Sequence, residues 1–159
     1  MQEKYLNYVE FSDYKRSLRI HPRVLKNFKK YEQKEGDFEA GGILLGYVYK
    51  DYDKTVKVTT PNQLDSKGFF FFNRSKIPAQ LQINRSWKRS RGSLIYLGEW
   101  HTHHEKTPFL STVDENMIKK VLEETEMEID FLYLILVGLN GTYWVGRQTT
   151  NGLIKLDLK

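Results

Sequence analysis

Two Asn-Gly pairs divide the C-terminal part of the sequence into three short, largely apolar segments. FLYLILVG begins at residue 131, and TYWVGRQ and GLIKLDLK follow it after Asn140-Gly141 and Asn151-Gly152. Asn and Gly adopt the positive φ angles of tight hairpin turns with little strain, so such pairs between apolar runs favour adjacent antiparallel strands. The sequence therefore predicts three consecutive strands, which any fold for this chain has to contain.

The rest of the sequence alternates between helical and strand patterns. Pro22 and Pro78 stand where the first turn of a helix tolerates proline, and the apolar residues of 112–126 fall at helical spacing. The apolar run SLIYLGEWH indicates a strand that is buried on both faces. We predict helices over 22–34, 75–91 and 112–126, and strands at EAGGILLGYVYK, TVKVTT, 69–72 and SLIYLGEWH. Three helices mixed with strands indicate an α/β sandwich around a largely central sheet.

The length of 159 residues is that of a single domain, which we place over residues 1–159. The absence of cysteine excludes disulfides, thiolate zinc sites, iron-sulfur clusters and cysteine nucleophiles, so a transition metal must be held by nitrogen and oxygen. The N-terminal segment has no apolar signal region, and the longest apolar run is too short to cross a bilayer. We therefore expect a cytoplasmic protein without membrane contact.

The net charge of +5 raises the question of nucleic-acid binding. The excess of cations falls on two predicted helices, which ordinarily direct such charges into solvent. The residues concerned are Lys26, Lys29 and Lys30, and Arg85, Lys88, Arg89 and Arg91. We do not expect nucleic-acid binding, but a non-catalytic, basic nucleic-acid-binding or scaffold domain stays open as an alternative.

The segment GEWHTHHEKTPFLSTVDENMI at 98–118 contains three of the chain's four histidines. Residues two apart point to the same side of an extended backbone, so His101 and His103 can bind one ion together. Catalytic zinc sites usually have three protein ligands, and here the third must be a carboxylate or one of the other histidines. We choose Asp114, because its loop can return to the strand end and a carboxylate is favoured at a helix N-terminus.

A purely structural role for this segment stays open at this point. A helix start alone would produce Ser111-x-x-Asp114, and Thr112-x-x-Glu115 fits a capping box even better. His104 points to the opposite face from its neighbours if the strand continues, so we expect it at the surface or near the ligands without binding metal. A His-x-His pair on its own is weak evidence for a metal.

With Glu39 in the upstream segment EAGGILLG, the residues complete a longer pattern. Glu39 is followed by His-Thr-His at 101–103, seven residues, and Ser-x-x-Asp at 111–114. This pattern resembles the JAMM motif of the JAB/MPN metalloprotease family, with the same spacing. The compact length and the GEWHTH string are most similar to the prokaryotic JAB branch, which includes the isopeptidases of CBASS antiviral operons. The chain departs from the family at His104 and Leu110, where proline is common, but not at a ligand position.

The resemblance implies a JAB/MPN-like, cytidine-deaminase-like arrangement of three layers, with a mixed central β-sheet flanked by about three helices. It also implies one Zn²⁺ per chain, bound by His101, His103 and Asp114, with water in the fourth position. Glu39 is then expected to be the general base, and Ser111 to donate a hydrogen bond to the tetrahedral oxyanion.

The family cleaves isopeptide or peptide bonds after the C-terminal glycine of ubiquitin-like proteins. The resemblance therefore implies a deubiquitinase-like isopeptidase whose substrate is a ubiquitin-like protein or a conjugated antiviral nucleotidyltransferase, with an operon-encoded E1/E2-like conjugation enzyme as a further partner. A peptidase that processes a ubiquitin-like or sulfur-carrier precursor is the alternative within enzymes. Trp100, Phe109 and the aromatics at 69–72 are candidates for a substrate groove, although aromatic residues are more often core.

Overall fold

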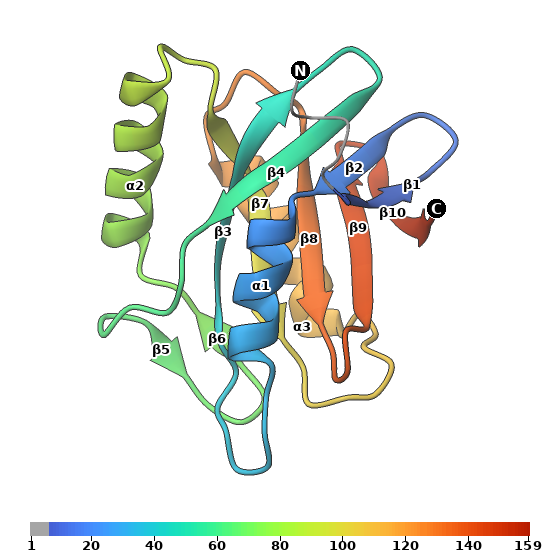
Figure 1. The fold of residues 1–159 in the computed structure, drawn as a ribbon. Helices are drawn as coiled ribbons and strands as arrows, with labels where there is room; N and C mark the ends of the chain where they lie inside the picture. Colours follow the sequence, from blue (N-terminus) through green and yellow to red (C-terminus); the bar gives the residue numbers. More distant parts are fainter. Residues whose placement is uncertain (1–6) are drawn as a thin grey trace.

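Eight of the ten strands in the described chain form one closed barrel, in the order β1-β10-β9-β8-β7-β3-β4-β2 (Figure 1). The computed structural model describes residues 7–159. Its helices are α1 (Pro22–Tyr31), α2 (Lys76–Arg89) and α3 (Thr112–Glu124). The barrel strands are β1 (Val9–Ser12), β2 (Ser17–Ile20), β3 (Gly41–Val48), β4 (Tyr52–Val58), β7 (Ile95–Thr102), β8 (Phe131–Val137), β9 (Tyr143–Thr149) and β10 (Gly152–Leu158). A separate pair consists of β5 (Ser66–Lys67) and β6 (Phe72–Asn73).

Closure of the barrel corrects the expected architecture. The mixed α/β content and the three helices are confirmed, but the sheet between the helices closes into a barrel and is not the open central sheet of a three-layer arrangement. Two strands that the sequence patterns did not indicate close the sheet as a hairpin: β1 pairs antiparallel with β10, and β2 pairs parallel with β4. Each has only four residues, too few for an alternating pattern to be recognised.

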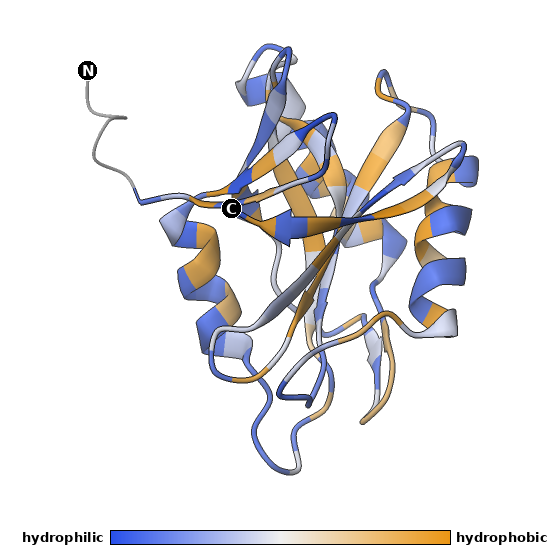
Figure 2. Cartoon of the chain, turned by 90° about the vertical axis from the view of Figure 1, so that its right-hand side faces the viewer, coloured by the Kyte–Doolittle hydropathy of each residue, from blue (hydrophilic) through white to orange (hydrophobic). Residues whose placement is uncertain are grey.

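Helices cover both faces of the barrel wall, which accounts for the continuous apolar runs of the central strands. All seven residues of β8 are buried. Its odd-numbered residues pack in one cluster with Val24 and Phe28 of α1, and its even-numbered residues pack in another with Ala79 of α2 and Ile118 of α3. Figure 2 shows the apolar residues concentrated along the strands, while the helices alternate between apolar and hydrophilic residues.

The C-terminal strands and the tight turn at Asn140-Gly141 are confirmed. β8, β9 and β10 are consecutive antiparallel neighbours. Asn140 and Gly141 have φ angles of 57° and 72°, values that favour asparagine and glycine. The second turn lies one residue earlier than predicted, at Thr150 and Asn151, because Gly152 already pairs with Thr149. The three predicted helices are also present, and each ends a few residues earlier than predicted.

The strand predicted at 69–72 is misplaced. β6 begins only at Phe72, and Phe69–Phe71 form an exposed turn in which the N–H of Gly68 donates to the carbonyl of Phe71 at 3.0 Å. Aromatic residues favour strands because they pack on a half-buried sheet surface. Here β5 and β6 pair only with each other, so no third strand extends the sheet under these rings.

A bulge interrupts β7 ahead of the histidines. Its pairing with β3 shifts register between Leu44 and Leu45, which leaves one extra residue in β7. Gly98, at this shift, has a φ of 147°, and a Cβ there would lie 1.9 Å from the carbonyl oxygen of Tyr133. Only glycine fits at this position, and the bulge sets the direction in which the end of β7 leaves the ladder.

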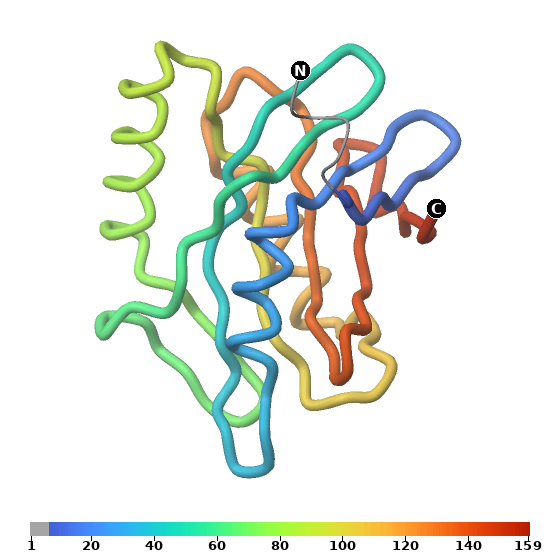
Figure 3. The backbone as a smooth tube through the Cα atoms, in the orientation of Figure 1, coloured from blue at the N-terminus to red at the C-terminus, as the bar shows by residue number. Residues whose placement is uncertain are grey.

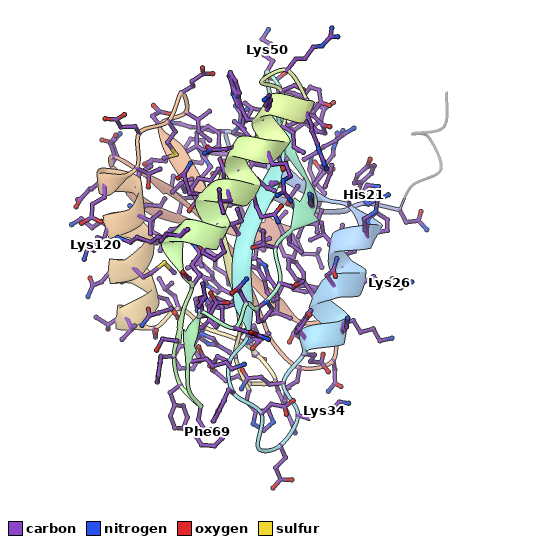
Figure 4. All side chains as sticks on the ribbon, turned by 90° about the vertical axis from the view of Figure 1, so that its left-hand side faces the viewer. His21, Lys26, Lys34, Lys50, Phe69 and Lys120 are labelled. Carbon is purple, nitrogen blue, oxygen red and sulfur yellow. The ribbon has the colours of Figure 1, made fainter. Side chains whose placement is uncertain are left out.

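Three connections meet at one end of the barrel, as the tube in Figure 3 shows: α1 to β3, the segment that holds β5 and β6, and β7 to α3. Figure 4 shows Lys34 and Phe69, from the first two of these connections, at the same end of the molecule and opposite Lys50. The parallel strands β7 and β8 both finish toward this end. It is the place where separate parts of the sequence come together.

No helix among residues 7–159 is long and apolar enough to cross a bilayer. A single domain over residues 1–159 and a cytoplasmic location stay predictions. Residues 1–6 of that predicted domain lie outside the part of the chain that the structure describes.

Candidate metal centre

The three predicted ligands lie together at this end of the barrel. Nε2 of His101 is 2.6 Å from Oδ1 of Asp114, and Nε2 of His103 is 3.2 Å from Oδ2 of the same carboxylate. The two imidazole centroids are 5.2 Å apart. One ligand atom from each of the three residues lies within 4.8 Å of the others, and all three residues are buried. This cluster can hold a metal ion.

Two strand ends and one helix start create the cluster. His101 belongs to β7, and the chain stays extended beyond it, so that the N–H of His103 donates to the carbonyl of Val137 in β8 at 2.9 Å. The two histidines therefore share a face, as their spacing predicts. The following loop is held to the β8–β9 turn by the N–H of Leu139, which donates to the carbonyl of Glu105 at 2.9 Å. It returns the chain to the start of α3.

Asp114 also caps α3. The Ser111 hydroxyl accepts the N–H of Asp114, and Oδ2 of Asp114 accepts the N–H of Ser111, both at 3.1 Å. This reciprocal pair is a capping box, so the capping role of Ser111 is confirmed and the box from Thr112 to Glu115 is wrong. Capping and metal binding do not exclude each other here, because the same geometry that caps the helix holds the carboxylate against both imidazoles.

Charge within the cluster favours a cation. Burial raises the pKa of Asp114, but hydrogen bonds from His101 and His103 lower it to well below the ordinary range of a carboxyl. Burial lowers the pKa of His103, but the hydrogen bond with Asp114 and the charges of Asp114 and Glu39 raise it above its usual value, with a further contribution from Glu105. Negative charge thus surrounds the two imidazoles, as a bound cation requires.

Glu105 contacts the other nitrogen of His103. Its Oε1 lies 2.8 Å from Nδ1 of the ring. When a metal takes the place of the proton on Nε2, this carboxylate can accept the proton that stays on Nδ1, so that the ring binds as a neutral imidazole. Metal-binding histidines commonly have such a partner. Sequence reasoning missed this residue; its only signal was an acidic side chain two positions after His103.

Glu39 reaches the cluster from the segment before β3. It is 7% exposed, and its backbone N–H donates to the carbonyl of Gly68 at 2.8 Å. Burial raises the pKa of Glu39; the charges of His101 and His103 lower it and that of Asp114 raises it, and the result is above the ordinary value. The groups that act most strongly on this carboxylate are therefore those of the cluster.

The remaining histidines lie outside the cluster. His104 is exposed, in agreement with a surface position. His21 precedes α1, where its Nδ1 accepts the N–H of Arg23 at 3.0 Å. Figure 4 shows His21 well away from the end of the molecule where Lys34 and Phe69 lie. Asp114, and neither His104 nor His21, lies beside His101 and His103, where the third ligand is predicted.

A groove of about 560 Å³ extends from His101 between α3 and the segment around β6. Phe72, Val113 and Met117 provide much of its apolar wall, while Trp100 borders it with its ring packed on Phe28 and Tyr31 of α1. Trp100 is 1% exposed and its indole N–H donates to the carbonyl of Thr59 at 2.9 Å, so it is also part of the core. Phe109 and Phe69–Phe71, the other aromatics considered for a groove, are exposed and do not line this one.

A buried ion pair borders the groove. Nε of Arg74 lies 2.7 and 2.9 Å from the two carboxylate oxygens of Glu99, and the hydroxyl of Tyr96 donates to Glu99 at 2.5 Å. Burial lowers the pKa of Arg74, but the charge of Glu99 raises it above its usual value. Glu99 stands two residues before His101 on the same side of β7, so the pair fastens the segment ahead of α2 to the strand that carries His101.

Comparisons with known proteins point to one family. A family model described as prokaryotic homologs of the JAB domain matches residues 21–151. The chain is 28% identical over 152 residues to a protein of Escherichia coli (strain TW11681) named CD-NTase/cGAS isopeptidase, covering 95% of this chain and 94% of that protein. A protein of the same name from Pseudomonas aeruginosa (strain BWHPSA011 / Pa011) is 29% identical over 127 residues, covering 79% and 80%. The solution structure of protein DSY2949 from Desulfitobacterium hafniense has a TM-score of 0.61 at 16% identity, covers 86% of this chain and 87% of that one, and shares the fold.

Proposed function

Because the chain belongs to the family of prokaryotic homologs of the JAB domain, we propose that it is a zinc-dependent isopeptidase. The proposed reaction is hydrolysis of the bond that joins the C-terminus of a ubiquitin-like protein, or of an antiviral nucleotidyltransferase, to a target. The two relatives named CD-NTase/cGAS isopeptidase support a conjugated nucleotidyltransferase in particular. The observation that carries the proposal is the convergence of His101, His103 and Asp114 within the electrostatic reach of Glu39.

The donor set fits one zinc ion per chain. Two imidazole nitrogens and one carboxylate oxygen form a known type of catalytic zinc site, which leaves a position for water. The sequence contains no thiolate that could compete as a ligand. When bound, zinc supplies Lewis acidity, which acidifies water and polarises a carbonyl group. His101, His103 and Asp114 are the residues that we propose to hold it.

Glu39 is the proposed general base. Water adds to the carbonyl carbon of the scissile bond while the carboxylate of Glu39 accepts a proton from it. When the C–N bond breaks, Glu39 returns that proton to the leaving amine, so the carboxylate is regenerated. Burial supports this role, because a raised pKa brings a carboxyl closer to the pH at which it can both accept and donate a proton.

Ser111 is the proposed donor to the oxyanion. Its hydroxyl oxygen accepts the N–H of Asp114, which leaves the O–H proton available to donate. The side chain is half-buried beside the cluster, and its capping role keeps it in place. A donor in such a position typically lowers the barrier by about 2.7–4 kcal/mol.

The groove that begins at His101 is the proposed path of the substrate chain. It is largely apolar, with the ion pair of Arg74 and Glu99 at its border. An extended C-terminal tail could lie along it and place its final carbonyl at the metal ligands. A conjugate of this kind has to be made first, so we propose an E1/E2-like enzyme as the functional partner of this chain.

Zinc dependence is tested by chelation. Treatment of the full chain with o-phenanthroline is expected to abolish cleavage of a conjugated nucleotidyltransferase, and added zinc is expected to restore it. Cleavage that continues after measured loss of zinc would contradict the proposal. A linear precursor offered beside a lysine-linked conjugate separates an isopeptidase from a precursor-processing peptidase, because the preferred substrate is consumed first.

A non-catalytic, basic nucleic-acid-binding or scaffold domain is the alternative from another class. Figure 4 shows Lys26, Lys50 and Lys120 on different sides of the molecule, an arrangement that does not favour one binding stripe. Retention on DNA or RNA that weakens steeply with added salt would support this alternative. Passage through such a column at low ionic strength would remove it.

A further inference from the structure

Two buried polar side chains outside the metal ligands hold the segment that carries Glu39. Gln33 lies just after α1 and is 4% exposed, and Thr102, between the two histidines, is fully buried. The Thr102 hydroxyl donates to Oε1 of Gln33 at 2.9 Å and accepts the N–H of Ala40 at 3.0 Å. Both hydrogen-bonding functions of the hydroxyl are therefore used.

The bond to Ala40 replaces part of the β-ladder. The N–H of Thr102 donates to the carbonyl of Ala40 at 2.8 Å, as in a regular antiparallel pair. In such a pair the N–H of Ala40 would return to the Thr102 carbonyl, but here it is donated to the Thr102 hydroxyl. Ala40 is thus held at both its backbone groups by one residue of β7, immediately after Glu39.

Gln33 extends this attachment to the loop before Glu39. Its Nε2 donates to the carbonyl of Asp37 at 3.3 Å, while its Oε1 accepts from Thr102. The side chain of Asp37 in turn accepts the N–H of Lys34 at 2.9 Å, which closes the loop. One buried amide therefore links the strand that carries the histidines to the loop that leads into Glu39.

We infer that Gln33 and Thr102 act as a clasp that positions the carboxylate of Glu39 against the metal cluster. The inference rests on the proposed role of Glu39 as base. Neither residue contributes a ligand atom to the cluster of His101, His103 and Asp114, so the clasp serves turnover and not metal binding. A catalytic group displaced by about 1 Å loses rate without losing its chemistry, with a cost that reaches about 100-fold.

The test compares Thr102→Val, Thr102→Ser and Gln33→Leu with Thr55→Val. Valine keeps the shape of threonine and removes the hydroxyl, whereas serine keeps the hydroxyl. Thr55 is the matched control, because it is also fully buried with a hydroxyl that donates to a backbone carbonyl, that of Leu45, but it lies in β4 away from Glu39. Four quantities are measured for each protein: kcat, KM, bound zinc per chain, and the exchange rate of the Ala40 amide in the metal-free protein.

Thr102→Val and Gln33→Leu are expected to lower kcat by about 10- to 100-fold with KM changed less than about twofold, and to keep about one zinc per chain. Exchange of the Ala40 amide is expected to accelerate in Thr102→Val. Thr102→Ser is expected to keep kcat and the Ala40 exchange rate close to those of the wild type. Thr55→Val is expected to change neither kcat nor this exchange rate. A wild-type kcat in Thr102→Val, or a lowered kcat that serine does not restore, would overturn the clasp.

The failure of the clasp and that of the proposed function are distinguishable. If the wild-type chain cleaves no conjugate and binds no zinc, the proposed isopeptidase function is wrong. The exchange rate of the Ala40 amide still tests whether Gln33 and Thr102 hold this segment, because it is measured on the metal-free chain. Unchanged exchange of Ala40 in both Thr102→Val and Gln33→Leu would show that the two side chains do not hold this segment, whatever the activity.

Discussion

Oε1 of Glu105 lies 2.8 Å from Nδ1 of His103, while Nε2 of the same ring faces Asp114. A carboxylate at Nδ1 favours the tautomer whose Nε2 is free to bind a metal, and this preference is lost without Glu105. Glu105→Ala is therefore expected to weaken zinc binding by about 10- to 100-fold. Competition with a chromophoric chelator measures the affinity. Glu123→Ala, an exposed change on α3, is the control, and equal affinities in the two variants would contradict the role of Glu105.

Substitutions of Glu39 and Asp114 are expected to affect different properties, turnover in the first case and zinc binding in the second. Glu39→Gln keeps the size of the side chain but cannot accept a proton, so it should lose about 100-fold or more in turnover while retaining about one zinc per chain. Asp114→Ala should lose the metal itself, because only two imidazoles remain. Parallel assays of turnover and bound zinc distinguish the two. Persistent turnover in Glu39→Gln would remove it as the base.

Gly98→Ala is expected to destabilise the barrel strongly. The added methyl group would meet the carbonyl oxygen of Tyr133 at 1.9 Å, and alanine is strained at a φ of 147°. Gly141→Ala is the matched control, since its φ of 72° is also positive but nothing lies within 4 Å of the new atom. We expect the free energy of unfolding to fall by about 1–2 kcal/mol in the control and by more in Gly98→Ala, as measured by urea unfolding. Equal losses would show that the backbone relaxes around the bulge.

The hairpin that closes the barrel predicts a dependence of stability on pH. Burial raises the pKa of Asp13, but hydrogen bonds from Arg147 and from the N–H groups of Lys15 and Arg16 lower it below its ordinary value. A depressed pKa stabilises the folded state above the unfolded value of about 3.9, and this contribution is lost as the pH falls through the folded pKa. Asp13→Asn should therefore lower the free energy of unfolding at pH 7 by about 1–3 kcal/mol.

The free energy of unfolding of Asp13→Asn should differ little from that of the wild type once the pH is below the folded pKa of Asp13. The wild-type carboxyl is then protonated and, like asparagine, uncharged. Urea unfolding at pH 7 and at successively lower pH measures the difference. A constant difference across this range would show that Asp13 contributes through packing and not through its charge.

The proximity of His101, His103 and Asp114 could be predicted because the geometry that brings them together is local in sequence. His101 and His103 share a face through strand periodicity alone, and Asp114 follows from the length of one loop and the start of one helix. The tight turn at Asn140-Gly141 was predictable for the same reason, since a two-residue turn depends on its own residues. The turn between β9 and β10 was predicted one residue too late, because strand pairing already includes Gly152.

The closure of the barrel and the support around the ligands could not be predicted in this way. β1 and β2 are stabilised by strands that lie far from them in sequence, and their own four residues carry little pattern. Gln33 looked like one polar residue near the end of a predicted helix, and only the fold places it 2.9 Å from Thr102, 69 positions away. Hydrogen bonds between residues so far apart in sequence produce no periodic pattern from which they could be predicted.

The closed barrel also restricts how a substrate can be recognised. All eight barrel strands have a hydrogen-bonded neighbour on each side, so none of them offers a whole free edge to an incoming peptide. Some strands pair over only part of their length, since β1 meets β10 only at Asp157 and Leu158, and within residues 7–159 β5 and β6 have no partner besides each other. The ribbon of β5 and β6 lies beside Glu39, whose N–H donates to the carbonyl of Gly68, and it has two residues in each strand. Main-chain pairing with a substrate next to Glu39 is therefore short, and selectivity among substrates has to come mostly from side chains.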